Sequence, residues 1–207
     1  MTDEESAYDA LSSVRNGDLA ALELLLSTNP KIARIAARGC GGRTLLQYAV
    51  SDGHTHIVTK LLAFGANPEA QDNRGFSALH AAAYCGRTEL LDLLLKQGAG
   101  CNIQDEGGLA PIHFAAAEGH TDAVKILLAQ PFVDVNIRDL RRKTPLHFAA
   151  SHCQVGTARV LLDQGADVNA VADDGGTPLD WAWFRENNKD VIALLQRLGG
   201  RLRNTKG

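Results

Sequence analysis

The sequence has few of the features that mark membrane or secreted proteins. No apolar run approaches the roughly 18 residues that a membrane-spanning helix needs. The acidic start, Met1 to Ser6, is unlike a secretory signal. Hydrophobic residues make up 45% of the 207 residues, charged residues make up 22%, and the formal net charge is −3. This balance is typical of a soluble chain that forms one extended domain. We therefore expect a cytoplasmic protein, with the nucleus as a second location.

Cysteine is scarce, and aromatic residues make up only 5% of the chain. The cysteines show no C-x-x-C spacing, so the sequence favours reduced thiols over disulfides or a zinc site. The four cysteines are Cys40, Cys85, Cys101 and Cys153.

The motifs of common enzyme classes are also missing. The chain has no G-x-S-x-G, no H-E-x-x-H and no P-loop. The glycines of Gly39-Cys40-Gly41-Gly42 precede Arg43 without the lysine or the spacing that a phosphate-binding loop requires. Cys85 and Cys153 each lie near a histidine position of a neighbouring repeat, but we interpret neither as a catalytic thiol. We expect a non-enzymatic protein without a cofactor.

The chain does contain one four-residue sequence motif that occurs five times. Its fourth position is histidine in three consecutive copies, at spacings of 33 and 34 residues. A glycine or its replacement follows six residues later, and an apolar doublet follows that. Such self-similarity indicates a repeat array in which each copy holds two short helices. The copies are Thr44-Leu45-Leu46-Gln47, Ser77-Ala78-Leu79-His80, Ala110-Pro111-Ile112-His113, Thr144-Pro145-Leu146-His147 and Thr177-Pro178-Leu179-Asp180.

The repeat resembles the ankyrin repeat in its period, its turn glycines and its closing Gly-Ala-Asp-Val-Asn phrase, which is complete at Gly165 to Asn169. The resemblance implies an all-α ankyrin-repeat solenoid of about six stacked helix-turn-helix units with projecting β-hairpin-like loops. We expect a single ankyrin repeat domain over 1–207. Its predicted parts are an N-terminal capping unit (5–38), four repeats (39–71, 72–104, 105–138 and 139–171), a C-terminal capping unit (172–200) and a basic tail (201–207).

The start and the turn of each unit follow from side-chain chemistry. Thr144 and Thr177 are expected to act as N-caps that accept a backbone N–H, and proline at the next position needs no donor there. Glycine at 53, 86 or 119 permits the left-handed backbone that ends the first helix. A single helical hairpin cannot bury its apolar stripe, so stability should come from the stacking of neighbours.

Histidine is plentiful, with seven residues, but metal binding is not the favoured interpretation. His80, His113 and His147 share one repeat position, so their rings are displaced along the stack by roughly 10 Å, too far to ligate one ion. The resemblance implies that these side chains join neighbouring units by hydrogen bonds. For His54, His56 and His120, at the turns, surface polarity is the favoured explanation rather than a metal or catalytic site.

Function should then depend on positions that the fold leaves free. In ankyrin proteins the binding residues lie on the hairpin tips and on the exposed, concave side of the first helices. The candidate partner-binding residues are Arg43, Asn73, Arg74, Phe76, Leu109, Leu140, Arg141 and Lys143 on the tips, and Asp52, Tyr84, Glu118, His152, Phe184 and Arg185 on the first helices. Phe76 with Tyr84, flanked by Arg74, is a candidate hot spot. The alternative is that Phe76 only covers the neighbouring tip.

The densest basic cluster is Arg138, Arg141, Arg142 and Lys143. Because the neighbouring tip carries Asp173 and Asp174, we expect ion pairs between the tips rather than nucleic-acid binding. An acidic protein segment is the functional alternative for this cluster.

Several residues depart from the repeat pattern. Cys153 and Glu186 replace the turn glycine, and Arg142 replaces the glycine of the hairpin, so the fifth unit is expected to be locally distorted. Phe132, next to Pro131, should project as an extra contact, and Ala110 lacks the hydroxyl of an N-cap.

These observations favour a protein–protein interaction module, an adaptor, scaffold, inhibitor or assembly factor, that is monomeric on its own. It is loosely similar to the ankyrin chaperones of proteasome assembly through its long first loop. Two alternatives stay open. One is a substrate-recruiting subunit of an enzyme complex such as a proteasome or ubiquitin-ligase assembly. The other is an asparaginyl hydroxylase substrate, because Asp-Val directly precedes Asn136 and Asn169, although the same pattern serves the hairpin.

Overall fold

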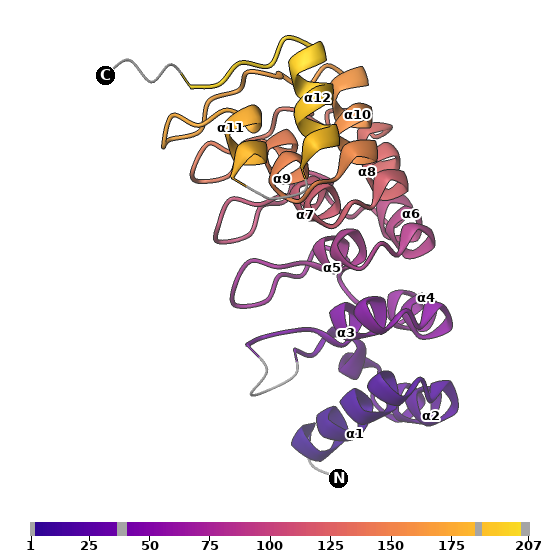
Figure 1. Cartoon of the computed structure of the whole chain (residues 1–207). Helices are drawn as coiled ribbons and strands as arrows, with labels where there is room; N and C mark the ends of the chain where they lie inside the picture. The colour runs from indigo at the N-terminus through magenta and orange to yellow at the C-terminus, as the bar shows by residue number, and fades with distance from the viewer. Residues whose placement is uncertain (1–2, 37–40, 185–187, 204–207) are drawn as a thin grey trace. The chain divides into compact units, whose positions relative to one another are not determined.

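The computed structural model describes residues 3–36, 41–184 and 188–203, which form twelve α-helices and one short 3-10 helix without any β-sheet among them. The all-α ankyrin-repeat fold predicted from the sequence is confirmed, with six pairs of helices (Figure 1). The helices are α1 (Asp3–Asn16), α2 (Leu19–Thr28), η1 (Pro30–Arg34), α3 (Leu45–Asp52), α4 (Thr55–Ala63), α5 (Ala78–Tyr84), α6 (Thr88–Lys96), α7 (Pro111–Glu118), α8 (Thr121–Leu128), α9 (Pro145–Ser151), α10 (Val155–Asp163), α11 (Pro178–Trp183) and α12 (Lys189–Arg197).

The chain forms two compact units. The first comprises Met1–Ala82 and Glu89–Gly100, and the second comprises Ala83–Thr88 and Cys101–Gly207. The division of the chain into one domain with capping units stays a prediction.

In the first unit, α1 packs against α2 and α3, and α4 packs against α2 and α3. Leu22, Leu26 and Leu46 are fully or almost fully buried in this core. The 3-10 helix η1 lies against α1, α2 and α3 and buries Ile32. It occupies the stretch where the sequence indicated a longer loop between the first two units.

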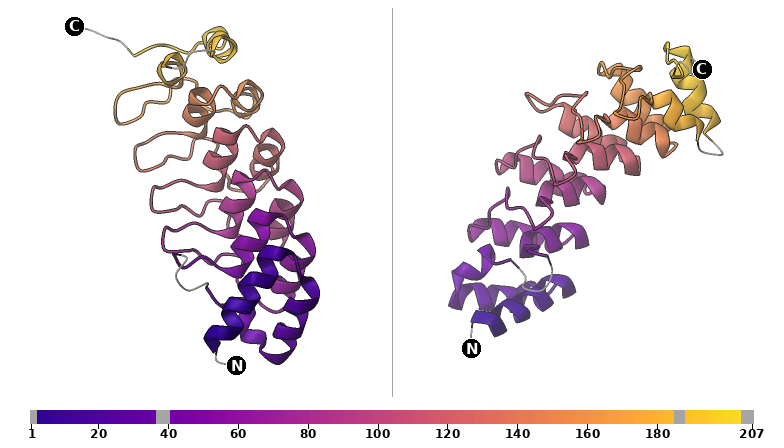
Figure 2. Two further views of the ribbon diagram at one scale, coloured as in Figure 1. Left: turned by 60° about the horizontal axis from the view of Figure 1, so that its bottom comes forward. Right: turned by 90° about the vertical axis from the view of Figure 1, so that its left-hand side faces the viewer.

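In the second unit the helices form two rows. The first helices α7, α9 and α11 pack side by side, and the second helices α8, α10 and α12 pack behind them (Figures 1 and 2). The apolar stripes meet between the rows, where Leu127, Leu146 and Leu161 are completely buried. Stacking therefore buries what one hairpin would leave exposed.

The expected helix starts are confirmed at Thr144 and Thr177, which directly precede α9 and α11. Thr177 also forms the expected capping bond, since its hydroxyl oxygen accepts the N–H of Asp180. The Thr144 side chain makes no such capping bond, and its hydroxyl lies 2.9 Å from Nδ1 of His147. At Ala110 the methyl group offers no acceptor, and His113 Nδ1 accepts the backbone N–H instead.

The turn between the helices keeps its form where glycine is replaced. Gly53 and Gly119 have φ angles of 82° and 76°, and Cys153 adopts the same left-handed conformation at 61°. The closing bond is also the same, since Gln154 donates its N–H to Ala149 O at 2.9 Å. The local distortion expected in the fifth unit is therefore wrong at this turn. The other replacement, Glu186, lies outside the described residues.

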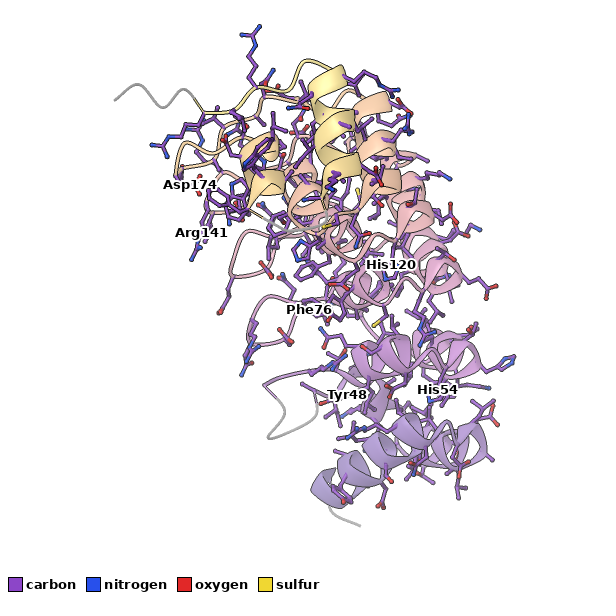
Figure 3. All side chains as sticks on the ribbon, viewed as in Figure 1. Tyr48, His54, Phe76, His120, Arg141 and Asp174 are labelled. Atoms are coloured by element: carbon purple, nitrogen blue, oxygen red, sulfur yellow. The ribbon has the colours of Figure 1, made fainter. Side chains whose placement is uncertain are left out.

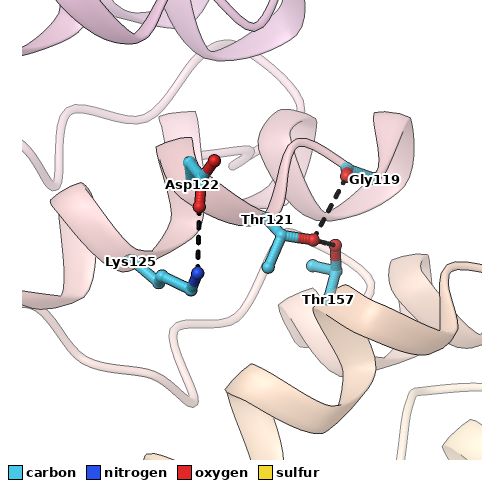
Figure 4. A network of polar contacts seen from close by, with 5 residues as sticks. All are labelled: Gly119, Thr121, Asp122, Lys125 and Thr157. Atoms are coloured by element: carbon cyan, nitrogen blue, oxygen red, sulfur yellow. Dashed lines mark hydrogen bonds and ion pairs between the residues drawn. The ribbon is translucent and has the colours of Figure 1, made fainter.

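Polar contacts add to the packing of the second helices. Thr121 Oγ1 at the start of α8 donates to Gly119 O and lies 3.0 Å from the hydroxyl of Thr157 in α10 (Figure 4). On the outer side of α8, Lys125 pairs with Asp122 at 2.9 Å. The hydroxyl pair links two neighbouring second helices, whereas the ion pair lies within one helix.

Within the described ranges, none of the helices has the length and apolar character to cross a membrane.

Candidate functional site

The repeated histidines join neighbouring hairpins, as the family resemblance implied. In the second unit, His113 Nδ1 accepts the N–H of Ala110 at 3.0 Å, and its Nε2 donates to Ile137 O at 3.1 Å. His147 repeats this with Thr144 N at 3.0 Å and Gly176 O at 3.3 Å. Since Nδ1 accepts, each neutral ring carries its proton on Nε2.

Burial lowers the pKa of both His113 and His147 below the ordinary value, because a charged imidazolium would lose its hydration there. Nearby Asp139 and backbone carbonyls oppose that effect at His113 without overcoming it. These rings are therefore neutral structural links at neutral pH. Of the residues that the structure describes, no three His, Cys, Asp or Glu side chains gather as they would around a metal ion.

A second line of hydrogen bonds crosses between hairpins at the position after the turn. His54 Nε2 lies 3.4 Å from Arg15 O in the first unit, and His120 Nε2 lies 3.0 Å from Tyr84 O in the second. Gln154 and Asn188 continue the line, and Asn188 Nδ2 donates to Ala150 O at 2.7 Å.

His54 and His120 therefore link neighbouring hairpins by hydrogen bonds, a role that their interpretation as polar surface residues did not include. The signal was present in the sequence, since positions 54, 120, 154 and 188 keep the repeat spacing and all carry side chains that form hydrogen bonds. For His56, which is exposed on α4, the structure gives no hydrogen bond or ion pair.

The hairpin tips are tied together through the main chain. In the second unit, Leu140 N donates to Gly107 O at 3.0 Å, and Asp173 N donates to Arg141 O at 3.0 Å. Figure 3 shows Arg141 and Asp174 at the ends of neighbouring loops. Because each loop is fixed to the next, the tip surface of the second unit is preorganised rather than formed by independent loops.

Each tip is also fixed internally by an aspartate. Asp139 Oδ1 accepts the N–H groups of Arg141 at 2.9 Å and Lys143 at 2.7 Å. Arg142 adopts a φ of 58° within this turn, where the other hairpins carry glycine. The aspartate therefore shapes the loop that presents the neighbouring cations.

The ion pairs expected between tips are not formed. Among the described residues, no carboxylate of Asp173 or Asp174 comes within 4.0 Å of a charged nitrogen of the basic cluster. Instead the Lys143 ammonium lies 3.8 Å from the centre of the Trp181 ring and 6.0 Å from that of Phe148. Arg138 donates to Val171 O at 3.0 Å. Lys143 and Arg138 of the cluster are therefore held by aromatic rings and a carbonyl group rather than by acids.

The candidate partner-binding residues differ in exposure. Nine of them are exposed and four are half-buried, while Arg185 lies outside the described residues. The exposed residues are Asp52, Asn73, Arg74, Tyr84, Glu118, Leu140, Arg141, His152 and Phe184, and the half-buried ones are Arg43, Phe76, Leu109 and Lys143.

Three of the candidates have internal contacts that reduce their availability. Arg43 lies 4.4 Å above the Tyr48 ring and donates to Ser51 Oγ. Phe76 packs 5.1 Å from the His80 ring of its own repeat in the first unit. Tyr84 contacts Phe114 edge to face at 6.3 Å in the second unit and stays half exposed.

Large apolar side chains are exposed at other points of the second unit. Phe132 is 93% exposed with a φ of 70°, which agrees with its expected projection. Phe184 is 86% exposed, and neighbouring Trp183 is 57% exposed at the end of α11. Trp183 was not among the predicted surface residues.

The asparagines of the hairpin phrase bridge to the following loop. Asn136 Oδ1 accepts from Asp167 N at 2.8 Å, and its amide donates to Gly165 O at 3.3 Å. Asn169 makes the same pair of bonds, to Arg201 N at 2.8 Å and Gly199 O at 3.0 Å. Both side-chain amides therefore connect their own loop to the following one.

Several known proteins are similar to part of this chain, and three of them are described here. The Notch-regulated ankyrin repeat-containing protein of Xenopus laevis is 39% identical over 74 residues, which are 35% of this chain and 64% of that protein. A probable E3 ubiquitin-protein ligase of Oryza sativa subsp. japonica is 39% identical over 72 residues, 35% of this chain and 14% of that protein. A human tRNA endonuclease is 39% identical over 69 residues, 31% of this chain and 10% of that protein. The match thus spans less than two thirds of each relative.

A family model for ankyrin repeats, described as three copies, matches residues 11–105, 86–172 and 112–204. Ankyrin repeats in general mediate protein–protein interaction, and the family is in general non-catalytic. With the paired helices, the neutral histidine links and the projecting tips, these matches show that the chain belongs to the ankyrin repeat family.

Proposed function

We propose that this chain is a non-enzymatic adaptor, scaffold, inhibitor or assembly factor that binds a protein partner through its hairpin tips and first-helix surface. The observation that carries the proposal is the chain of main-chain bonds from Gly107 through Leu140 and Arg141 to Asp173. A surface that is already ordered loses little conformational freedom on association.

The residues available on that surface support a protein partner. Leu140 is 72% exposed beside the exposed side chain of Arg141. Arginine is one of the residues in which the binding energy of protein interfaces concentrates, and the exposed leucine beside it adds apolar contact area. Glu118 and His152 extend this surface along the first helices.

Affinity capture tests the proposal. The intact protein is used as bait in lysate of its source cells, beside a Leu140→Ala, Arg141→Glu variant and an Arg159→Glu control. Arg159 is exposed on the second helix α10, so the control has the same charge reversal as Arg141→Glu, away from the tips. We expect a partner that the control retains and the tip variant loses. Equal retention by all three proteins would contradict the assignment of the surface.

The substrate-recruiting role is a more specific form of this proposal. Its support is the likeness to a probable E3 ubiquitin-protein ligase, of which the match spans only 14%. Ligase or protease activity that co-purifies with the wild type and is lost with the tip variant would favour it. A partner without such activity would favour an adaptor or inhibitor.

Asparaginyl hydroxylation stays a subordinate proposal for Asn136 and Asn169. Because both amides bridge to the next loop, a hydroxylase would need these loops to open locally. Peptide mass spectrometry of protein purified from its source cells tests it. An added oxygen on either residue would support modification, and unmodified peptides would exclude it under those conditions.

We also propose a cytoplasmic or nuclear location. The support is that the thiols of Cys85, Cys101 and Cys153 are free, as is usual in reducing compartments. Fractionation of source cells with an antibody against the protein tests this directly, and recovery from a secretory compartment would contradict it.

A further inference from the structure

The tip of the fifth hairpin and the segment beside it gather five cationic side chains within the second unit. We call this surface the basic tip, and it comprises Arg138, Arg141, Arg142, Lys143 and Arg203. Arg203 belongs to it because its Nη1 donates to Asp174 O on the neighbouring loop at 2.6 Å.

The nearby carboxylates are mostly engaged in bonds to the main chain. Asp139 accepts two N–H groups of its own turn. Asp174 accepts from Gly176 N at 2.9 Å, and Asp180 accepts from Thr177 and from Arg203 N. Hydrogen bonds from N–H groups offset part of a carboxylate's charge. Asp173 and Glu106, on the two adjoining loops, are the remaining exposed carboxylates, and neither forms an ion pair with the basic tip among the described residues.

The positive charges of Arg141 and Arg142 are therefore exposed to solvent and are not neutralised by nearby carboxylates. The Arg141 and Arg142 side chains are exposed and have no hydrogen bond or ion pair within the described part of the chain. Their backbone positions are nevertheless fixed by Asp139 and by the bond from Asp173 N to Arg141 O. Exposed Leu140 lies directly beside them.

We propose that the basic tip binds an acidic segment of the partner protein, with glutamate or aspartate carboxylates on Arg141 and Arg142 and an apolar side chain on Leu140. This inference rests on the proposed function and specifies the chemistry of the partner. A guanidinium group matches a carboxylate through two parallel N–H bonds, so arginines favour such a ligand over a neutral one.

A nucleic acid fits the same surface less well. Proteins that bind single strands stack bases on open aromatic faces. Here the Lys143 ammonium already lies over the Trp181 ring at 3.8 Å. Leu140 offers an apolar contact that a phosphate backbone would not use. Charge complementarity combined with an exposed leucine therefore favours a protein segment.

Fluorescence anisotropy with defined probes tests the inference on the intact protein. The probe is a labelled synthetic peptide of repeating Glu-Glu-Leu units, compared with the same peptide carrying Gln for every Glu and with a labelled oligothymidylate. We expect the acidic peptide to bind more tightly than both, with affinity that falls as salt concentration rises. Arg141→Glu should weaken its binding roughly tenfold or more, because a favourable contact becomes a like-charge one. Arg159→Glu should leave it nearly unchanged.

Each contrary outcome has a definite meaning. Equal binding of the Gln peptide, or equal loss with Arg159→Glu, would overturn the acidic-segment proposal. Tip-dependent binding of the oligothymidylate in preference to the peptide would overturn it in favour of nucleic acid. If the intact protein instead self-associates through the basic tip in sedimentation, the ligand is the acidic start of a second copy, and the proposal falls. A captured partner that depends on Leu140 and Arg141 while no acidic peptide binds would leave the proposed function standing without this inference.

Discussion

The imidazoles of His113 and His147 work as neutral links whose two nitrogens have different tasks. Nδ1 accepts an N–H at the start of its own helix, and Nε2 donates to the next loop. Gln47 performs the same two tasks in the first unit, since its Oε1 accepts from Thr44 N and its Nε2 donates to Phe76 O. At these three positions one side chain thus supplies both an acceptor and a donor, and a protonated imidazole has no acceptor to offer.

This chemistry predicts acid sensitivity. The pKa of His113 and of His147 is lowered by folding, so above the unfolded pKa of about 6.5 the neutral links contribute fully to stability. As the pH falls below that value, the unfolded chain binds protons first, and the free energy of unfolding decreases until the lowered pKa is reached. Urea denaturation measured from pH 7.5 down to about pH 5 should show this loss.

The matched variant is the double substitution His113→Gln, His147→Gln, which places glutamine where the first unit already has Gln47. It should retain most of its stability at neutral pH and lose less than the wild type on acidification. An identical acid response in both proteins would mean that other groups cause it.

Contacts of single side chains were the least predictable from the sequence. The histidine links were implied by the family resemblance, and the line through His54, His120, Gln154 and Asn188 could have been found from its repeat spacing. The tip ion pairs were predicted wrongly because opposite charges in neighbouring loops do not determine side-chain distances. Asp139 and Asp174 bond to backbone N–H groups of their own turns instead.

At the scale of elements, the turn between paired helices tolerates a side chain at some cost. Cys153 is exposed and has a φ of 61°. A left-handed conformation costs a residue other than glycine roughly 1–2 kcal/mol, and glycine forfeits about 0.4–1 kcal/mol through its freer unfolded chain. Cys153→Gly should therefore raise the free energy of unfolding by at most about 1.6 kcal/mol.

Chemical denaturation in the presence of a reductant measures this effect. Cys153→Ser keeps a β-carbon and removes the thiol, so its stability should match the wild type within error. A stabilisation by serine equal to that by glycine would assign the effect to the thiol rather than to the backbone.

Gly108 in its hairpin lies close to the backbone of the next loop. A β-carbon on Gly108, whose φ is 75°, would lie 2.6 Å from Leu140 N. Gly165 also has a left-handed φ, 87°, but a β-carbon there would meet nothing within 4 Å. Both alanine substitutions strain the backbone, and Gly108→Ala should cost roughly 1–3 kcal/mol more because the backbone of the next loop must shift.

Thermal or urea unfolding of the two variants gives this comparison. Equal destabilisation would show that the tips are not held against each other as closely as the structure indicates. The starts of α9 and α11 could be predicted from Thr-Pro, and the turns after α3 and α7 from glycine. The unaltered turn at Cys153 could not be predicted, because the sequence does not reveal how much strain the surrounding packing can hold.

On the scale of the whole molecule, the repeat period was enough to predict the family and the six helical pairs. It did not predict the two compact units, since the repeat pattern continues across Ala83 and Cys101 without a break. Candidate binding residues were predicted by register, and nine are exposed. Arg43 and Lys143 show the limit of that reasoning, because their cations lie over Tyr48 and Trp181.

The central claim is that a protein partner binds on the tips of the second unit. Site-specific photo-crosslinking in the source cells tests it most directly, with benzoylphenylalanine placed at Leu140 in one protein and at Arg159 of α10 in another. Leu140 is largely exposed, and Arg159 is exposed on a second helix, so both substitutions should preserve the fold. We expect a light-dependent adduct with one partner protein from position 140 and none from position 159. An adduct that forms only from position 159, or equally from both, would contradict it.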